Sequence, residues 1–163
     1  MTNNIQKNYE KELNAIKALL PKLKGMIKEL RATSEFRVDQ KAKNDLVTTA
    51  DLALEAFLVN QIRELFPDDV IWAEENHPKP EELNQRVWII DPIDGTTNFS
   101  HGFAPYCVSI ALWDKTELVM GVVYELAHNQ CFYATKGQGA YLNGSPLQIS
   151  TRSKPEESLI ATK

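Results

Sequence analysis

The chain has 163 residues, of which 43% are hydrophobic and 25% are charged, and its formal net charge is -4. These values are typical of a globular domain and exclude a disordered or membrane-embedded chain. The charge is uneven, because residues 1–44 carry +5 and the remainder carries -9. A basic first segment is compatible with nucleic-acid binding, but its lysines fit the solvated side of a helix better, so we expect no nucleic-acid partner.

The two cysteines, Cys107 and Cys131, lie far apart, without the close-spaced Cys or His partners of a zinc site. We interpret them as reduced thiols. The first residues lead into further charge, unlike a secretory signal, and no stretch approaches the roughly 20 apolar residues of a membrane span. We therefore expect a cytoplasmic protein without a membrane partner.

The first predicted element is a long amphipathic helix. Its apolar residues alternate in steps of three and four and therefore share one helical face: Tyr9, Leu13, Ile16, Leu20, Leu23, Ile27 and Leu30. Pro21 lies inside this pattern, where proline removes a hydrogen bond and crowds the preceding turn, so we expect a kink or a break into two helices. The spacing also suits a coiled coil, but packing on a sheet or a partner subunit is favoured because the heptads are few and interrupted.

A second helix is predicted after a polar loop over residues 31–43. Thr48 and Asp51 have the spacing of a capping box, in which the side chain of each residue bonds the backbone amide of the other. Apolar residues then recur at helical spacing: Leu54, Leu58, Ile62 and Leu65. The helix is expected to end before Pro67.

Several strands are predicted from short runs of β-branched and aromatic residues: Val70–Ala73, Val87–Ile90, Tyr106–Trp113, Glu117–Tyr124 and Gln130–Thr135. Asp114-Lys115 and Asn143-Gly144 are typical of hairpin turns, so neighbouring strands are expected to be antiparallel. The predicted fold class is α+β, a layered sandwich of helices on a mostly antiparallel sheet.

The run Asp91–Phe99 is the most informative segment, because it combines two carboxylates, a glycine and two threonines directly after a buried strand. Asp91 is expected at the end of that strand, with Asp94 returning to the same point. Hard oxygen ligands converging in this way favour Mg²⁺ or Mn²⁺ over zinc. The alternative interpretation is that Asp and Thr merely cap a helix.

This run resembles the signature of the inositol monophosphatase family of Mg²⁺-dependent phosphatases. Four further segments resemble the same family in the same order: Asp45–Thr48 with Asp51, Ala73–Glu75, Gly121–Tyr124, and Lys136–Ala140 with Asn143-Gly144. The resemblance implies the N-terminal domain of the inositol monophosphatase and fructose bisphosphatase fold.

The resemblance also implies a ligand set for two or three Mg²⁺ ions, with Mn²⁺ as a possible substitute. Glu74 and Asp91 would share the first cation, with the carbonyl of Ile93 as a third ligand. Asp91 and Asp94 would share the second cation, and such metal pairs activate water and hold a leaving oxygen. Direct ligation by Glu75 is disfavoured.

Catalytic roles follow from the same resemblance. The amides of Gly95 and Thr96, with Asp94 beside them, would bind the substrate phosphate at the start of a helix. The hydroxyl of Thr96, paired with Asp45, would orient and deprotonate the attacking water, with Glu74 acting beside the metal.

The expected function is hydrolysis of inositol monophosphate or a related sugar phosphate, with lithium inhibition and a homodimeric assembly implied by the family. Fructose 1,6-bisphosphate and 3'-phosphoadenosine 5'-phosphate are alternative substrates. A non-catalytic module that dimerises or binds a partner through its first helix is the alternative of a different class.

One departure from the family bears on activity. Family members carry a second domain with a Trp-Asp motif that completes the second metal site, whereas Trp113-Asp114 of this chain lies at a predicted hairpin turn. Residues 1–163 are therefore expected to form the N-terminal metal- and phosphate-binding domain without its C-terminal domain. Such a chain would be weakly active or inactive by itself.

Overall fold

The computed structural model of the protein describes residues 8–34, 36–42 and 45–157, and for residues 41, 42 and 45 it describes the backbone only. Within these ranges the helices are α1 (Glu10–Arg31), α2 (Thr49–Leu65) and α3 (Thr96–His101), with a 3-10 turn at Pro155–Glu157. The strands are β1 (Val38–Ala42), β2 (Asp45–Thr48), β3 (Val70–Ala73), β4 (Arg86–Asp94), β5 (Cys107–Asp114), β6 (Glu117–Glu125), β7 (Gln130–Thr135), β8 (Ala140–Leu142) and β9 (Ser145–Pro146).

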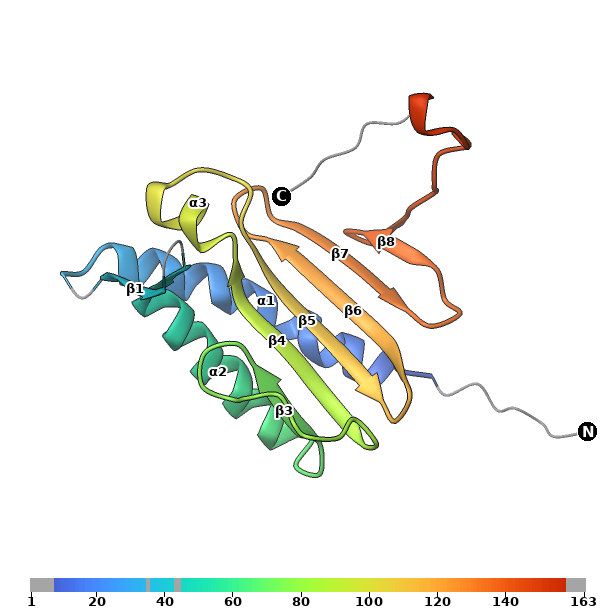
Figure 1. Ribbon diagram of the computed structural model, residues 1–163, viewed down its shortest axis with the longest axis horizontal. Coiled ribbons are helices and arrows are strands. Elements are labelled where there is room, and N and C mark those ends of the chain that lie inside the picture. Colours follow the sequence, from blue (N-terminus) through green and yellow to red (C-terminus); the bar gives the residue numbers. More distant parts are fainter. Residues whose placement is uncertain (1–7, 35, 43–44, 158–163) are drawn as a thin grey trace, which may run out of the picture.

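The main sheet has the strand order β3-β4-β5-β6-β7-β8-β9. Each neighbouring pair is antiparallel except β3 and β4, which run parallel. The two long helices pass behind this sheet in Figure 1, while its other face is turned toward the viewer. The predicted α+β class is therefore confirmed. None of the described helices is both long and apolar enough to cross a membrane.

The first helix differs from its prediction at Pro21. α1 is one continuous helix that contains this proline, so the predicted break into two helices is wrong. Apolar side chains on both sides of Pro21 are buried in the same core, among them Ile16 and Leu23. This shared packing holds the two halves in line, since helices in proteins are stabilised mainly by their buried face.

The predicted loop over residues 31–43 is also wrong in part. Val38–Ala42 forms β1, which pairs with β2 as a separate two-stranded sheet. This polar segment has no apolar alternation because only one small hairpin, and not the main core, is built from it. The capping box is confirmed, since Thr48 and Asp51 exchange the expected bonds at the start of α2.

The hairpin predictions are confirmed. β5 and β6 are joined by a short turn in which Lys115 has a positive φ of 63°. Asn143 and Gly144 join β8 and β9 with φ values of 49° and 89°, the left-handed conformation that such a turn requires.

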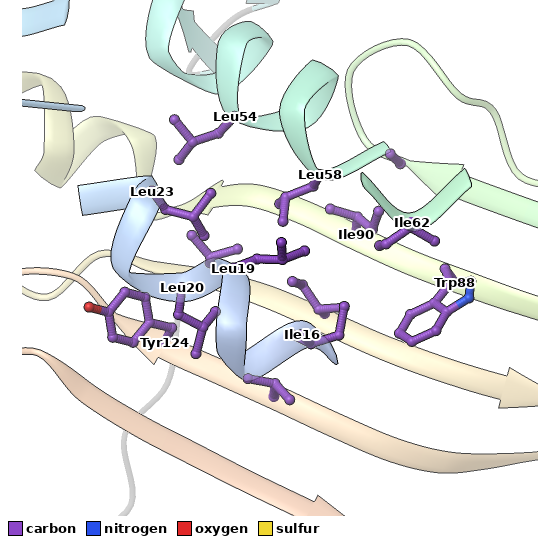
Figure 2. Packing of buried hydrophobic residues seen from close by; sticks show 14 of the residues in the cluster. Ile16, Leu19, Leu20, Leu23, Leu54, Leu58, Ile62, Trp88, Ile90 and Tyr124 are labelled. Carbon is purple, nitrogen blue, oxygen red and sulfur yellow. The ribbon is translucent and has the colours of Figure 1, made fainter. Parts of the chain in front are cut away.

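The hydrophobic core lies between the long helices and one face of the sheet. Figure 2 shows Leu19 and Leu23 of α1 on the side of α2, toward Leu54 and Leu58, and Leu20 toward Tyr124 of the sheet. Side chains of alternate sheet residues close the core from below: Trp88, Ile90, Val108, Ile110, Leu112, Val122 and Tyr124. Their burial explains why these strands are detectable from sequence by alternation.

This packing predicts a difference between two leucines of α2. Leu58 is completely buried and Leu52 is 43% exposed. We expect Leu58→Ala to lower the unfolding free energy by about 3 kcal/mol, because it leaves a cavity, and Leu52→Ala to lower it by less than about 1 kcal/mol. Urea unfolding followed by circular dichroism measures both. Equal losses in the two variants would contradict this assignment of the core.

Candidate functional site

Five of the predicted site residues lie where β4 leads into α3 (Figure 1): Asp91, Ile93, Asp94, Gly95 and Thr96. β4 extends beyond Asp91 to Asp94, so the strand does not end at Asp91 as predicted. The pairing with β5 is nevertheless irregular between these two aspartates, which face Ser109 and Cys107. Pro92 lies in this irregular stretch, where its missing N–H removes no regular ladder bond.

Asp91 is the most perturbed group of the site. Its Oδ1 atom is buried and has no hydrogen-bond partner among the described residues. Burial, with the nearby charge of Glu74 and a hydrogen bond with that residue, raises the pKa of Asp91 to about 7. Asp94 and Asp51 contribute smaller charge effects in the same direction. A cation would relieve this strain, since it supplies the positive charge that the buried oxygen lacks.

Glu74 follows β3, and its amide donates to the carbonyl of Ile90 at 3.1 Å. This bond continues the parallel pairing of β3 and β4 and places Glu74 next to Asp91. The predicted proximity of these two carboxylates is therefore present in the structure.

Asp94 makes a weaker contact in this part of the structure than Glu74 does. Its Oδ2 atom lies 3.9 Å from the thiol of Cys107, a weak contact, and its charge reaches Asp91. Burial, with the charges of these two aspartates, raises the pKa of Cys107 to about 11. The described residues contain no group of three or more His, Cys, Asp or Glu side chains arranged to hold a metal ion. Glu74 and Asp91 therefore lie side by side as predicted. The full set of metal ligands remains a prediction.

The turn after β4 requires glycine at residue 95. Gly95 has a φ of 89° and is the N-cap of α3. A Cβ atom at this residue would lie 3.2 Å from the carbonyl oxygen of Pro105. Only glycine combines this backbone conformation with such a close approach, and the first-turn amides that follow it have no acceptor within the helix.

The hydroxyl of Thr96 links the turn to α2. It lies 2.9 Å from the carbonyl oxygen of Ile93 and 3.3 Å from Oδ1 of Asp51. A hydroxyl has one proton, so it donates to one of these acceptors at a time and keeps lone pairs for a further ligand. The carbonyl of Ile93, a predicted metal ligand, therefore lies beside the hydroxyl of Thr96.

Asp51 is the site residue that the sequence analysis missed. It is almost fully buried, and its Oδ2 atom accepts bonds from the amide and the hydroxyl of Thr48. Burial raises its pKa, against the lowering effect of these hydrogen bonds. The side chain of Asp45, the predicted partner of Thr96, lies outside the described residues, so that pairing stays a prediction. The capping-box spacing was a usable signal, because a capping carboxylate has a second oxygen.

Comparison with known proteins places the chain in a family. A profile of the inositol monophosphatase family matches residues 8–163, and the chain therefore belongs to that family. Inositol monophosphatase 3 of Solanum lycopersicum is 40% identical over 129 residues, which are 77% of this chain and 48% of that protein. A Thermotoga maritima fructose-1,6-bisphosphatase/inositol-1-monophosphatase is 40% identical over 130 residues, 77% of this chain and 50% of that protein.

A third relative has a name of a different kind. Nus factor SuhB of Escherichia coli is 40% identical over 136 residues, which are 83% of this chain and 51% of that protein. The chain spans about half the length of the curated relatives it matches.

Solved structures agree with the fold. The Thermotoga maritima IMPase superposes with a TM-score of 0.77 at 35% identity, covering 86% of this chain and 54% of that one. An IMPase/NADP phosphatase complexed with Mg²⁺ and phosphate gives a TM-score of 0.81 at 26% identity, covering 91% and 56%. A LiCl-soaked inhibitory complex of a staphylococcal inositol monophosphatase gives 0.83 at 25% identity, also covering 91% and 56%.

The raised pKa of Asp91 predicts a pH dependence of stability in the metal-free protein. Because the folded pKa of Asp91 is about 7 and a solvated Asp has a pKa of 3.8, ionisation of Asp91 opposes folding as pH rises from about 4 to about 7. We expect this group to lower the unfolding free energy by about 2 kcal/mol over that range, roughly half of the full shift because solvent screens a partly buried carboxyl.

Urea unfolding of the chelator-treated protein at several pH values measures this loss. Asp91→Asn cannot ionise and provides the reference, so that its unfolding free energy should fall less than that of the unaltered protein. Parallel pH profiles for the two proteins would contradict the assigned pKa.

Proposed function

We propose that this chain is the metal- and phosphate-binding domain of a Mg²⁺-dependent phosphomonoesterase that acts on inositol monophosphate or a related sugar phosphate. The observation that carries the proposal is the buried Oδ1 atom of Asp91, which has no hydrogen-bond partner among the described residues and lies next to Glu74 and close in sequence to Gly95 and Thr96. Carboxylates without a cation repel one another, so their proximity supports a divalent ion as the missing partner.

Glu74, Asp91, Asp94 and the carbonyl of Ile93 are the residues proposed to hold the metal. The donor set is entirely oxygen, which suits Mg²⁺ and Mn²⁺. When bound, divalent cations of this kind activate water and neutralise the charge of a phosphate group. The number of ions, two or three in the complete family site, belongs to the proposal.

The phosphate group is proposed to bind at the turn of Gly95 and Thr96, beside Asp94. The first-turn amides of a helix have no acceptor within the helix and therefore suit an anion. The close contact of Gly95 with the chain at Pro105 supports this arrangement, because any larger residue would force the turn to shift.

Thr96 and Asp51 are proposed to accept the proton of the attacking water. The hydroxyl of Thr96 is within reach of the Asp51 carboxylate, so a water that donates to Thr96 can pass its proton toward this acceptor. The geometry favours Asp51 for the role that the resemblance assigned to Asp45. Direct attack by water requires no covalent intermediate, and catalysis then rests on orientation and charge stabilisation.

The substrate class is the least constrained part of the proposal. Among the relatives, one is named as acting on fructose 1,6-bisphosphate and inositol 1-phosphate, and another was solved with NADP. Inositol monophosphate is preferred because two of the three relatives named above carry that name. Lithium inhibition, suggested by the LiCl complex, is part of the same proposal. A cytoplasmic location, supported by two free cysteines, completes it.

Metal binding and turnover test this proposal separately. We expect Mg²⁺ titration calorimetry to detect binding to the chain, and inorganic phosphate to bind only with Mg²⁺ present. Asp91→Asn should abolish metal binding, whereas Asp68→Asn, in an exposed turn, should leave it unchanged. Thr96→Val should leave Mg²⁺ affinity within about threefold while lowering hydrolysis of inositol 1-phosphate by about 100-fold.

We expect slow turnover from residues 1–163 tested by themselves, because these residues span about half the length of the relatives that they match. Turnover at the rate of a complete family member would contradict the expected dependence on a second domain. Absence of any Mg²⁺ binding would overturn the proposed function itself.

An association role is the second candidate, and the face of the sheet that none of the described helices covers favours it. Leu118, Val123 and Leu147 are 54%, 40% and 45% exposed. Val123 and Leu147 line an apolar hollow of about 260 Å³ together with Phe132. Exposed apolar surface of this kind drives association, and we propose a homodimer formed through it.

Light scattering tests the homodimer. We expect twice the monomer mass at micromolar concentration and the monomer mass for Val123→Glu, with Lys136→Glu as a charge-changing control on an exposed turn. A monomer at all concentrations would contradict the proposed dimer.

A further inference from the structure

Glu55 is a buried carboxylate that the mechanism above does not use. It lies on α2, one helical turn after Asp51, and only 1% of its surface is exposed. A charged carboxylate at such a place is strongly destabilising unless hydrogen bonds compensate it. The bonds that compensate Glu55 therefore identify what this residue does.

All three described partners of Glu55 lie immediately after Glu74. The amide of Glu75 donates to Oε2 at 2.7 Å, and the amide of Asn76 donates to Oε1 at 2.9 Å. The ring Nδ1 atom of His77 lies 3.0 Å from Oε1. Both carboxylate oxygens thus hold one short turn, at the shorter distances typical of charge-assisted bonds.

The same turn is held from two other directions. Ala73 and His77 exchange both backbone hydrogen bonds, at 2.8 and 3.2 Å, which closes the turn. The amide of Glu74 donates to the carbonyl of Ile90 in β4 at 3.1 Å. The backbone of Glu74 therefore has one anchor on the strand that carries Asp91 and a second anchor, through the following two residues, on α2.

We propose that Glu55 is a positioning residue for the metal ligand Glu74, an inference that rests on the proposed function. Residues four apart project from the same face of a helix. Asp51 and Glu55 have this spacing, and they reach the hydroxyl of Thr96 and the turn after Glu74 respectively. α2 thereby sets the separation between the phosphate-binding turn and the Glu74 carboxylate.

Glu55→Gln tests this role because it keeps the shape of the side chain. An amide side chain has one acceptor oxygen and one NH₂ group, so it cannot accept from both backbone amides and would face one of them with another donor. The turn would lose one of the two backbone hydrogen bonds that it donates to Glu55, and Glu74 would be held less well against Asp91. Residues that orient metal ligands typically contribute about 10-fold to 100-fold in metal affinity.

The experiment is calorimetric titration of the full chain with Mn²⁺ and Mg²⁺. We expect Glu55→Gln to weaken metal binding about 10-fold. Glu64→Gln, on the exposed side of the same helix, is the matched control and should bind as the unaltered chain does. Thermal unfolding of each variant without metal reports any loss of stability, and affinities are compared at a temperature where every variant is folded.

A double-mutant cycle with Glu74→Gln separates positioning from a general loss of structure. If Glu55 acts through Glu74, the change Glu55→Gln should weaken binding less than about twofold once Glu74 is already replaced. Additive losses in the double variant would overturn the proposal. So would unchanged affinity in Glu55→Gln when the unaltered chain binds metal. Absence of binding in the unaltered chain would instead overturn the proposed function, and the inference with it.

Discussion

The burial of carboxylate oxygen atoms in Asp51, Glu55 and Asp91 is the constraint on which the rest of the site depends. Asp51 is compensated by the capping box with Thr48, and Glu55 by the amides of the turn after Glu74. Asp91 has a buried oxygen without a described hydrogen-bond partner. Since unpaired buried charge strongly opposes folding, the first two carboxylates serve the protein's own structure, and the third is suited to a cation.

α2 connects these compensations. Its first turn is stabilised by Thr48 and Asp51, and the same Asp51 reaches the hydroxyl of Thr96 at the start of α3. Helix stability and site geometry therefore use one side chain. Packing of α2 against α1 and β4 holds this helix in place, as Leu54 and Leu58 in Figure 2 illustrate. The positions of the Asp51 carboxylate and the Thr96 hydroxyl are therefore set by a hydrophobic core several residues away from them.

Local patterns predicted much of the fold because each pattern has a local physical cause. The capping box, the Asn143-Gly144 turn and the alternating strands all depend on neighbours within a few residues. The predictions failed where tertiary packing opposes local preference. α1 continues through Pro21 because its buried face extends beyond the proline on both sides, and β1 forms from a polar segment that pairs only with β2.

The sequence by itself determined the family, the α+β class and the proximity of Glu74 to Asp91, because strand ends and glycine turns are encoded in short runs of residues. Only the tertiary structure decided that Thr96 faces Asp51 and that Glu55 holds the turn after Glu74. These contacts join residues 20 and 45 positions apart in the chain. A local periodicity in the sequence cannot predict contacts between residues so far apart in the chain, because these contacts depend on how α2 packs beside β3, β4 and α3.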